Sequence, residues 1–574
     1  MLSIPRPLPP APIDCPPSTD LDLSRLLQAH SDVRASGVSN ACGIRFPVPT
    51  KLNLDAWFHL LRDYNDSKLC NLLAFGFPIN YVKDVLPRVP WTNHGSALQY
   101  ASHVDRYISK EVTKGAMLGP FNSNPLATDL VLSPLQTVDK KGSTDRRVVV
   151  DLSYPSHTSI NAGIPKHEYM GEQTHLSYPS VDNLVQLVLQ HGRGCKLMKV
   201  DLSRCYRQFY VDPGDYHLLG IQWRSKVWID ITLPFGLRSA ALNAQRVSDA
   251  VRYLYRLLYQ RDVINFLDDF GSAADPLDAD LAFHQLCTLI QDILGLDIGP
   301  DKCISPTTCL PFLGIELDTV ALVLRIPQSK IQAALSLLRG WISQRHASKS
   351  QLQSLLGTLI HISYCVKPGR RFVARIINLI KASHFPADLD FEFSLDIRWW
   401  LKFMEVYNGV SMIQDSPWSL PDAVMSTDAC LSGCGGFYQG NYFHTPFPDA
   451  ISQAGLDINE LELMTLSVAL KLWGHNFSRQ RLVIACDNET AVTAVNTGRS
   501  TSETVQRILR DIWFMEAEFD FTVRAVHIRG VDNKLSDHLS RWELSAAHRT
   551  HFFELAQAEG HRLHECTVHL DLFN

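Results

Sequence analysis

The sequence predicts a multidomain α+β protein, and three observations lead to that class. The chain has 574 residues, more than one hydrophobic core can organise, so three or four domains are expected. Its apolar fraction of 45% and charged fraction of 20% are those of globular proteins. Short apolar strands mix with helices over residues 130–320, helical patterns fill 327–382, and a second α/β pattern runs from Ala423 to about Trp542.

The same patterns divide the chain into five segments. The first, 1–45, is rich in Pro and Ser and is expected to be a flexible leader. Residues 46–320 form the first mixed region, and 321–422 form a basic helical region. A second mixed region covers 423–545, and 546–574 are expected to be a helical or frayed tail.

Apolar spacing and start signals place the helices. From Leu52 to Leu86 the chain has a helical pattern, with Trp57 among its apolar anchors. Pro327 suits the first turn of a helix. Another helix begins near Ser350, and its apolar stripe consists of Leu352, Leu355, Leu356, Leu359 and Ile360.

Positive charge is concentrated in one part of the chain. The net charge of −5 by itself argues against a nucleic-acid partner. Between Asp318 and Asp388, however, there is no acidic residue, while that stretch carries ten lysines and arginines. Such a block offers phosphate contacts. The alternative is a solvated basic face, although such faces usually interleave both signs.

The sequence favours an intracellular protein, with cytoplasm and nucleus left open. No apolar stretch approaches the ~20 residues that a membrane span requires, and prolines interrupt the first residues, so no signal peptide is expected. The 13 cysteines include no Cys-x-x-Cys pair, which indicates reduced thiols rather than a zinc or redox motif.

Two adjacent acids, Asp268 and Asp269, interrupt the apolar run from Val263 to Gly271. The flanking residues favour strands and the acids favour a turn, so a hairpin is expected. Because two close carboxylates repel each other, a divalent cation would stabilise them. The alternative is an ordinary Asp-rich turn.

A third acid and a basic hairpin could complete this site. Asp201 ends the short strand that starts at Lys196, and it could meet the Asp268 hairpin from an adjacent strand. Three carboxylates could then hold two Mg²⁺ ions next to substrate phosphates. The run from Lys140 to Arg147 could fold over a triphosphate, although alone it would read as a solvated turn.

Four further acids stand at the starts and ends of elements in the second mixed region. They are Asp428, Glu462, Asp487 and Asp537. Together they could surround two Mg²⁺ ions and support hydrolysis by metal-activated water. Glu460 competes with Glu462, but the register of the following leucines favours Glu462. Any one of these acids alone would more often be a helix cap or a surface residue.

The order of the motifs resembles that of reverse transcriptases. After Asp201 come Leu233–Ala240, Phe266–Asp269, Lys302 and Phe312–Gly314. The chain looks like the polymerases of LTR-type retroelements, and most like those of DIRS-like retrotransposons, which integrate with a tyrosine recombinase. The second acid set resembles ribonuclease H. The resemblance covers roughly residues 50–545.

The resemblance implies a right-hand polymerase, with fingers and palm in 46–320 and a thumb or connection in 321–422, followed by a ribonuclease H-like domain in 423–545. It assigns Asp201, Asp268 and Asp269 as metal ligands of the polymerase, and Asp428, Glu462, Asp487 and Asp537 as those of the nuclease.

Further roles follow from the same resemblance. Lys302 matches a general acid for pyrophosphate, and His527 matches a histidine that assists product release. Tyr206 matches the aromatic gate that excludes a 2′-hydroxyl; the alternative is a core tyrosine beside Phe209. The remaining matches are Lys140 and Arg147 (with Arg146 as a competitor) for the triphosphate, Phe235 and Gly236 for the nucleotide, and Phe312, Leu313 and Gly314 for the primer grip. A departure is Ala240–Gln245, which replaces the commoner proline-containing run.

The expected activity is RNA- and DNA-directed DNA synthesis with cleavage of the RNA strand of a hybrid. Its cofactor would be Mg²⁺, two ions per active site, with Mn²⁺ as a substitute. Its partners would be an RNA template, a DNA primer, an RNA/DNA hybrid and dNTPs, with no membrane; a tyrosine recombinase and a capsid protein would be separate chains. The alternatives are a catalytically silent nucleic-acid-binding protein, a pararetroviral polymerase and a nuclease only.

Overall fold

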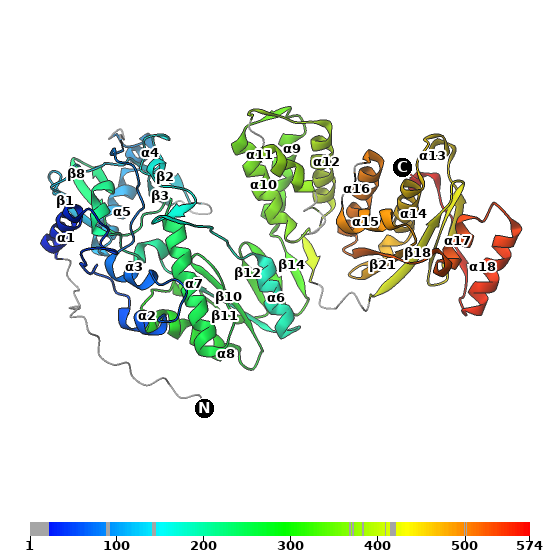
Figure 1. Ribbon diagram of the computed structural model, residues 1–574, viewed down its shortest axis with the longest axis horizontal. Helices are drawn as coiled ribbons and strands as arrows, with labels where there is room; N and C mark the ends of the chain where they lie inside the picture. Colours follow the sequence, from blue (N-terminus) through cyan, green and yellow to red (C-terminus); the bar gives the residue numbers. More distant parts are fainter. Residues whose placement is uncertain are drawn as a thin grey trace. The chain divides into compact units, whose positions relative to one another are not determined.

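The chain folds into two compact units, which divide between Leu310 and Pro311. Both contain helices and sheets, so the prediction of a multidomain α+β protein is confirmed. The division falls earlier than the predicted boundary at 320. The computed structural model describes residues 22–573 (Figure 1), except 88–91, 141–144, 367–368, 370–371, 382–383, 408, 414–420, 499 and 501.

A four-stranded antiparallel sheet lies at the centre of the first unit, in the order β11-β6-β10-β9. Helices pack against its strands, and Val200 and Phe270 are fully buried in the core between them. The elements are β6 (Lys196–Asp201), β9 (Ile264–Phe266), β10 (Asp269–Ala274), β11 (Ile304–Thr307), α6 (Val181–His191), α7 (Ala240–Tyr259) and α8 (Ala279–Cys287).

The N-terminal part of this unit differs from the expected leader. Residues 23–36 form a helix, α1, whose Leu26 and Val33 are buried. It packs against the short helix η3 (Pro213–Leu218). The first 21 residues lie outside the described part of the chain. The helical pattern expected from Leu52 resolves into α2 (Leu54–Leu60) and α3 (Leu69–Phe75).

Three smaller sheets lie in the described part of the first unit. One has the order β1-β8-β7, one is the hairpin of β2 and β3, and one pairs β4 (Glu168–Tyr169) with β5 (Glu172–Gln173). Helix α5 contacts β1 and β3. The bounds are β1 (Met117–Phe121), β2 (Leu135–Asp139), β3 (Arg146–Val150), β7 (Gly220–Trp223), β8 (Lys226–Asp230) and α5 (Ala101–Thr113).

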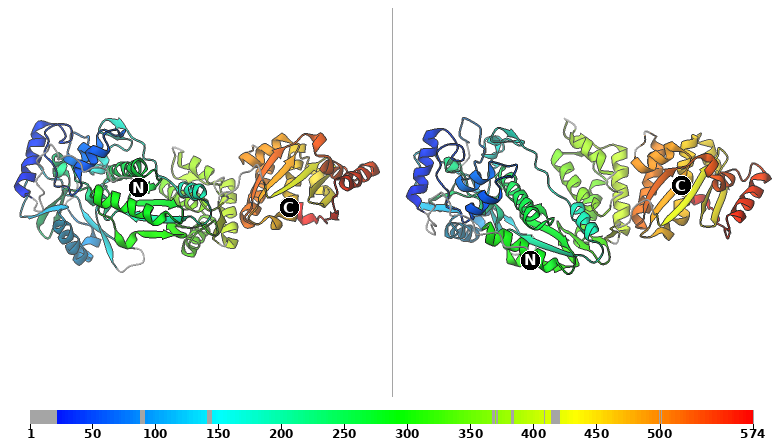
Figure 2. Two further views of the ribbon diagram at one scale, coloured as in Figure 1. Left: turned by 90° about the horizontal axis from the view of Figure 1, so that it is seen from below. Right: turned by 60° about the horizontal axis from the view of Figure 1, so that its bottom comes forward.

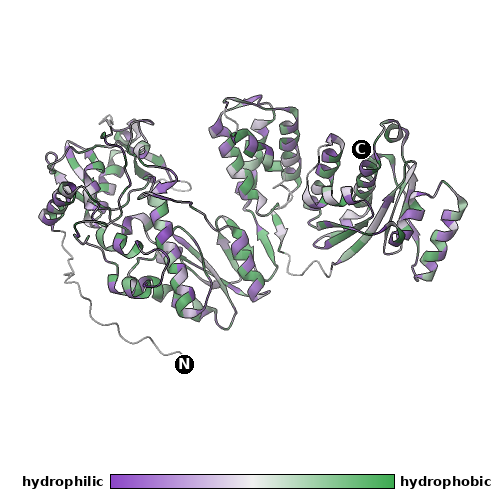
Figure 3. Ribbon diagram, viewed as in Figure 1, coloured by the Kyte–Doolittle hydropathy of each residue, from purple (hydrophilic) through white to green (hydrophobic). Residues whose placement is uncertain are grey.

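The second unit begins with a small sheet, β12-β13-β14-β17, and a group of helices. Hydrophobic and hydrophilic residues alternate around these helices (Figure 3), and the buried face of α12 includes Trp400 and Phe403. The elements are β12 (Cys309–Phe312), β13 (Ile315–Asp318), β14 (Val323–Arg325), β17 (Val410–Met412), α9 (Gln328–Trp341), α10 (Lys349–Ser363), α11 (Ala374–Lys381) and α12 (Phe391–Val406).

Arg375, one of the ten basic residues between Asp318 and Asp388, is engaged by acids of its own unit. Its guanidinium lies 3.2 Å from Asp396 and 3.5 Å from both Asp390 and Glu392, at the start of α12. Arg510 also pairs with two of these acids, at 2.5 Å from Glu392 and 3.1 Å from Asp396. Arg375 therefore fixes a helix of its own unit. Two further basic residues of this stretch, 370 and 371, lie outside the described residues.

A six-stranded mixed sheet forms the rest of the second unit, in the order β22-β21-β18-β19-β20-β23. β18 pairs in parallel with β21 and antiparallel with β19, and α14 packs on its face. The elements are β18 (Ala423–Ala429), β19 (Gly433–Tyr438), β20 (Asn441–Pro446), β21 (Arg481–Cys486), β22 (Thr522–His527), α14 (Ile458–Trp473), α15 (Glu489–Thr497), α16 (Glu503–Glu518) and α17 (Lys534–Ser540).

The segment 546–574, expected to be a tail, extends this sheet. Helix α18 (Ala546–Ala558) lies beside α17 (Figure 2) and buries Phe552 against Trp542 and Leu539. Strand β23 (His564–Glu565) then pairs in parallel with β20. Within the described residues, no helix combines the length and the apolarity that crossing a membrane requires.

Candidate active sites

Three acids meet at one end of the central sheet of the first unit. β6 ends at Asp201, β10 begins at Asp269, and these two residues are directly opposite partners in the antiparallel pair. Asp268 lies in the turn between β9 and β10, where Leu267 has a φ of 54°. Its carbonyl oxygen accepts the Leu202 N–H at 2.8 Å. Side chains of opposite partners share a face of the sheet, so the carboxylates of Asp201 and Asp269 come together.

Burial and mutual repulsion perturb these acids. The pKa of Asp201 is raised to about 6, chiefly by burial; the hydrogen bond from Lys302 opposes this rise, and the hydrogen bond with Asp269 contributes to it. Burial also raises the pKa of Asp268, as does the neighbouring charge of Asp269. Lys302 Nζ lies 2.9 Å from Asp201 Oδ1, as a donor to this carboxylate.

A second lysine, which sequence reasoning missed, is paired with the same cluster. Lys199 Nζ lies 2.7 Å from Asp269 Oδ1. The signal was present: Lys199 precedes Asp201 by two residues on a strand, so both side chains point to the same face. The site thus holds three carboxylates and two ammonium groups before any cation binds.

Tyr206, predicted to contact a nucleotide, lies near these acids, since the charge of Asp268 acts on its hydroxyl. The rings of Tyr206 and Phe235 meet edge to face, with centroids 5.2 Å apart. Tyr206 is half-buried in η2 (Cys205–Gln208), whereas the Phe235 side chain is exposed. Gly236 has a φ of 93°, and its carbonyl oxygen accepts a hydrogen bond from Asn161 Nδ2 at 2.7 Å. Asn161 was also missed by sequence reasoning, and no local pattern marks it.

The basic hairpin presents two of its three candidate cations to solvent. Lys140 and Arg147 are exposed. Arg146 is engaged internally, since it pairs with Asp139 and its guanidinium lies 3.9 Å from the ring centroid of Tyr100. This geometry leaves Lys140 and Arg147 as the groups that can reach a ligand. The loop residues 141–144 lie outside the described part of the chain.

The predicted primer grip is a tight turn in the second unit, between β12 and β13. The Phe312 side chain is buried, whereas Leu313 and Gly314 form the turn with φ values of 49° and 78°. Lys330 Nζ donates to the Gly314 carbonyl oxygen at 3.1 Å. His361 Nε2 lies 3.1 Å from the Leu313 carbonyl oxygen and 3.1 Å from Lys330 Nζ. Two helices, α9 and α10, therefore support this turn.

The four acids of the second unit also converge. Asp428 lies on β18, Glu462 on α14, Asp487 directly after β21, and Asp537 on α17. Carboxylate oxygens of Glu462 and Asp487 and the sulfur of Cys486 lie within 4.8 Å of one another. Glu462 Oε1 accepts the Ala429 N–H at 3.1 Å, which ties α14 to the end of β18. Ser540 Oγ donates to Asp428 Oδ2 at 2.5 Å.

The electrostatics of these acids reflect their crowding. The pKa of Glu462 is raised to about 9, chiefly by burial and also by the charges of Asp428 and Asp487. The pKa of Asp428 is raised to about 7, chiefly by burial; the hydrogen bond from Ser540 opposes the rise, and the charges of Asp487 and Asp537 contribute to it. The four carboxylates therefore act on each other as one cluster.

Glu460 and His527 lie near the second acid cluster, and each is hydrogen-bonded to a different partner. Glu460, the competitor of Glu462, joins a capping box with Asp457 and accepts the Ser502 hydroxyl at 2.6 Å. His527 is exposed at the end of β22, where its Nε2 lies 3.1 Å from the carbonyl oxygen of Asp487. His527 is thus bonded to the backbone beside the acid cluster.

Both clusters fit a divalent cation that prefers oxygen ligands. Carboxylates are the hard donors that Mg²⁺ binds. A bound cation stabilises the ionised form of buried carboxylates that repel each other, because it offsets negative charge that water no longer solvates. The residues that could hold it are Asp201, Asp268 and Asp269 in the first unit, and Asp428, Glu462, Asp487 and Asp537 in the second.

Comparison with known proteins gives structural matches only. No family model matches this chain. No curated protein matches it either. Among solved structures, it is similar to the foamy viral protease-reverse transcriptase dRH in complex with double-stranded DNA, at 14% identity and a TM-score of 0.45, over 91% of this chain and 84% of that one. It is also similar to the foamy viral protease-reverse transcriptase in complex with RNA/DNA hybrid, at 14% identity and a TM-score of 0.39, over 90% of this chain and 64% of that one.

Proposed function

We propose that this chain is a reverse transcriptase: an RNA- and DNA-directed DNA polymerase that also cleaves the RNA strand of RNA/DNA hybrids. The observation that carries the proposal is the convergence of two separate carboxylate clusters, each built from elements far apart in sequence. Asp201 faces Asp269 across β6 and β10, and the acids of β18, α14, β21 and α17 gather in the second unit. The motif order supports the same assignment.

In the polymerase site, Asp201, Asp268 and Asp269 would hold Mg²⁺, and the nuclease site would hold it through its four acids. When bound, two Mg²⁺ ions per site, or Mn²⁺ in their place, supply Lewis acidity at phosphate oxygens and activate the attacking hydroxyl or water. Lys302, whose ammonium donates to Asp201, would give a proton to departing pyrophosphate. Lys140 and Arg147 would contact the triphosphate of the dNTP.

Selection of the sugar falls to Tyr206. Its ring is held against Phe235, which limits the room on one side of the nucleotide. A 2′-hydroxyl would meet that ring, so deoxyribonucleotides would be preferred. Phe235 and Gly236 would lie beneath the nucleotide, with Gly236 fixed by Asn161.

In the nuclease site, Asp428, Glu462, Asp487 and Asp537 would position water for attack on an RNA phosphate. His527, held to the Asp487 carbonyl, would assist release of the cleaved strand. Both activities serve one process: copying RNA leaves a hybrid, and its RNA strand must be removed before a second DNA strand is made. The basic helices α9–α11 would contact the backbone of such a duplex, with the turn of Phe312, Leu313 and Gly314 on the primer.

The process we propose is replication of a DIRS-like retrotransposon. A tyrosine recombinase and a capsid protein would then be separate chains of the same element. A pararetroviral polymerase of similar layout is distinguished by its genomic neighbours, since capsid and protease genes would surround it.

Two variants test the proposal by separating the activities. Primer extension on poly(rA)/oligo(dT) should be abolished by Asp268→Asn with Asp269→Asn, while cleavage of an RNA/DNA hybrid persists. Asp487→Asn should do the reverse. Exposed acids away from the clusters give matched controls: Asp292→Asn in the first unit and Glu503→Gln in the second. If the unsubstituted chain incorporates no dNTP with Mg²⁺ or Mn²⁺, it is a silent binding protein or only a nuclease, and the polymerase assignment is wrong.

A further inference from the structure

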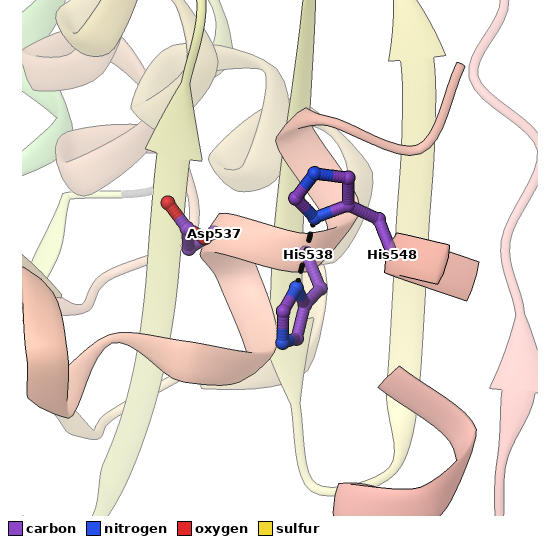
Figure 4. A group of neighbouring side chains, drawn as sticks. All are labelled: Asp537, His538 and His548. Atoms are coloured by element: carbon purple, nitrogen blue, oxygen red, sulfur yellow. Dashed lines mark hydrogen bonds between the residues drawn. The ribbon is translucent and has the colours of Figure 1, made fainter. Parts of the chain in front are cut away.

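A group of histidines lies between α17 and α18, outside both acid clusters except for one shared residue. His538 comes from α17, and His548 and His551 come from α18. Figure 4 shows His548 reaching toward His538, with Asp537 one residue earlier on the same turn of α17. The Nδ1 atoms of His538 and His548 are 3.0 Å apart, and ligand atoms of Asp537 and both histidines lie within 4.8 Å of one another.

The third histidine extends the group toward solvent. His548 and His551 are three residues apart on a helix, so they lie on the same face of α18. The ring centroid of His551 is 5.6 Å from that of His538, and that of His548 is 5.3 Å away. His551 is exposed and the other two rings are half-buried, so an ion in solution has a path to all three imidazoles.

From this geometry we propose that His538, His548 and His551 form a binding site for a transition-metal ion such as Zn²⁺, with Asp537 as a further oxygen ligand. Imidazole nitrogens suit Zn²⁺, Ni²⁺, Co²⁺ and Cu²⁺, whereas Mg²⁺ selects oxygen. Two nitrogens bound to a tetrahedral Zn²⁺ at its usual bond lengths are about 3.3 Å apart. The separation of 3.0 Å between the two Nδ1 atoms is therefore close to what such an ion requires.

The hydrogen bond between the two rings is itself informative. Both partners are Nδ1 atoms, so one must offer a lone pair and its ring must be neutral. That lone pair points at the other Nδ1. A metal ion that replaces the shared proton would bind both nitrogens after a small rotation of the rings, which widens their separation from 3.0 Å to about 3.3 Å.

The scaffold around the histidines is already fixed. Leu539, Trp542 and Phe552 form a small apolar cluster that holds α17 against α18. Arg549 Nε also donates to the Trp542 carbonyl oxygen at 3.0 Å. Rigid support of this kind lowers the cost of gathering ligands, which favours metal binding. The competing explanation is that the histidine pair only links the two helices.

The proposed metal site does not depend on the proposed function. The two share one residue, Asp537. That carboxylate pairs with Arg541 at 2.8 Å and belongs to the second acid cluster. For this reason Asp537 is left intact in the test below, and binding is measured by spectroscopy instead of activity.

Titration of the full chain with Co²⁺ in excess Mg²⁺ tests the site. Mg²⁺ occupies oxygen-only sites, and Co²⁺ held by imidazoles in a four-coordinate site gives strong visible ligand-field absorption. One equivalent of such absorption is expected, and Zn²⁺ should remove it by displacement. An intense near-ultraviolet thiolate band in its place would assign the ion to cysteines and overturn the proposal.

Variants locate the ion. His538→Ala with His548→Ala should abolish the visible absorption, and His551→Ala should weaken Co²⁺ binding by at least about tenfold. His551 is exposed, so its replacement leaves the fold intact even if the double variant does not fold. The matched control is His564→Ala with His569→Ala, two exposed histidines on the same C-terminal segment. Equal Co²⁺ affinity in the His551→Ala variant, the double variant and the control would show that the pair is only a structural link.

Discussion

At the residue scale, the Lys199–Asp269 pair has two opposing effects on the first unit. In the metal-free protein the ammonium offsets one of three crowded carboxylates, and both side chains of the pair are largely buried, with exposed fractions of 16% and 21%. A cation bound to Asp269 would compete with it. Lys199 thus stabilises the empty site and weakens the affinity for the ion.

Replacing this lysine should separate the two effects. Lys199→Met is expected to lower the free energy of unfolding of the metal-free protein by about 1–3 kcal/mol, between the contributions of an exposed and a buried ion pair. The same variant should gain more stability from added Mg²⁺ than the unsubstituted chain does. Thermal unfolding in EDTA and in Mg²⁺ measures both. The control is Lys196→Met, on the same strand but the opposite face. If Mg²⁺ stabilises Lys199→Met less than it stabilises the unsubstituted chain, Lys199 does not compete with the ion for Asp269.

Tyr206 gives a second prediction at this scale. Tyr206→Val removes the ring that packs on Phe235. The preference for dNTPs over rNTPs should then fall by about 10- to 100-fold, the range expected when a pocket loses a steric contact. Steady-state incorporation of dGTP and rGTP measures it. Tyr206→Phe keeps the ring and should keep the preference; if the Val variant discriminates equally well, the gate lies elsewhere.

At the element scale, the β12–β13 turn requires its glycine. Gly314 has a φ of 78°, and a Cβ there would lie 2.1 Å from Lys330 Nζ. Gly314→Ala is therefore expected to displace Lys330, to cost about 1–2 kcal/mol of stability, and to weaken primer binding.

Gly340 in α9 is the matched control for this turn. It has no neighbouring atom within 4 Å of an added Cβ, so Gly340→Ala should raise stability by about 0.5–1 kcal/mol. Chemical denaturation and primer-template titration measure the two effects. Unchanged stability and primer affinity in Gly314→Ala would show that the turn tolerates a side chain.

The elements also show what sequence reasoning could and could not reach. Strands ending in an acid are visible as short apolar runs, so Asp201 and the Asp268 hairpin could be placed on neighbouring strands from pattern alone. Lys199 could have been found by the two-residue period of a strand. Asn161 and Arg375 could not, because their partners, Gly236 and the acids of α12, are chosen by tertiary packing. The sequence predicts a helical or frayed tail over 546–574 but not its packing on the sheet, because only Phe552 and Ala556 of α18 are buried and no continuous apolar stripe marks that helix.

At the scale of the whole molecule, the second acid cluster makes stability depend on pH. Burial and mutual repulsion raise the pKa of Asp428 to about 7 and that of Glu462 to about 9. The folded protein therefore binds more protons than the unfolded chain above the ordinary carboxyl pKa of about 4. This contribution to stability is complete below that value and is lost as the pH rises through 7 and then 9.

Thermal unfolding in EDTA should accordingly show the second unit becoming less stable from pH 6 to pH 9.5, and Mg²⁺ should restore more stability at the upper end. Glu462→Gln removes the later titration, so the decline above pH 8 should flatten in that variant. A variant with the same decline as the unsubstituted chain would mean that another group titrates there.

Strand β23 pairs with β20 at one edge of the six-stranded sheet. Asn441 and Tyr442 of β20 pair with His564 and Glu565, so backbone groups that would otherwise be open are occupied. A shortened version that stops before β23 would carry a bare strand edge, which is a template for adding strands from other molecules. Poor solubility of such a truncated chain would then come from the unpaired edge of β20, and would not indicate damage to either acid cluster.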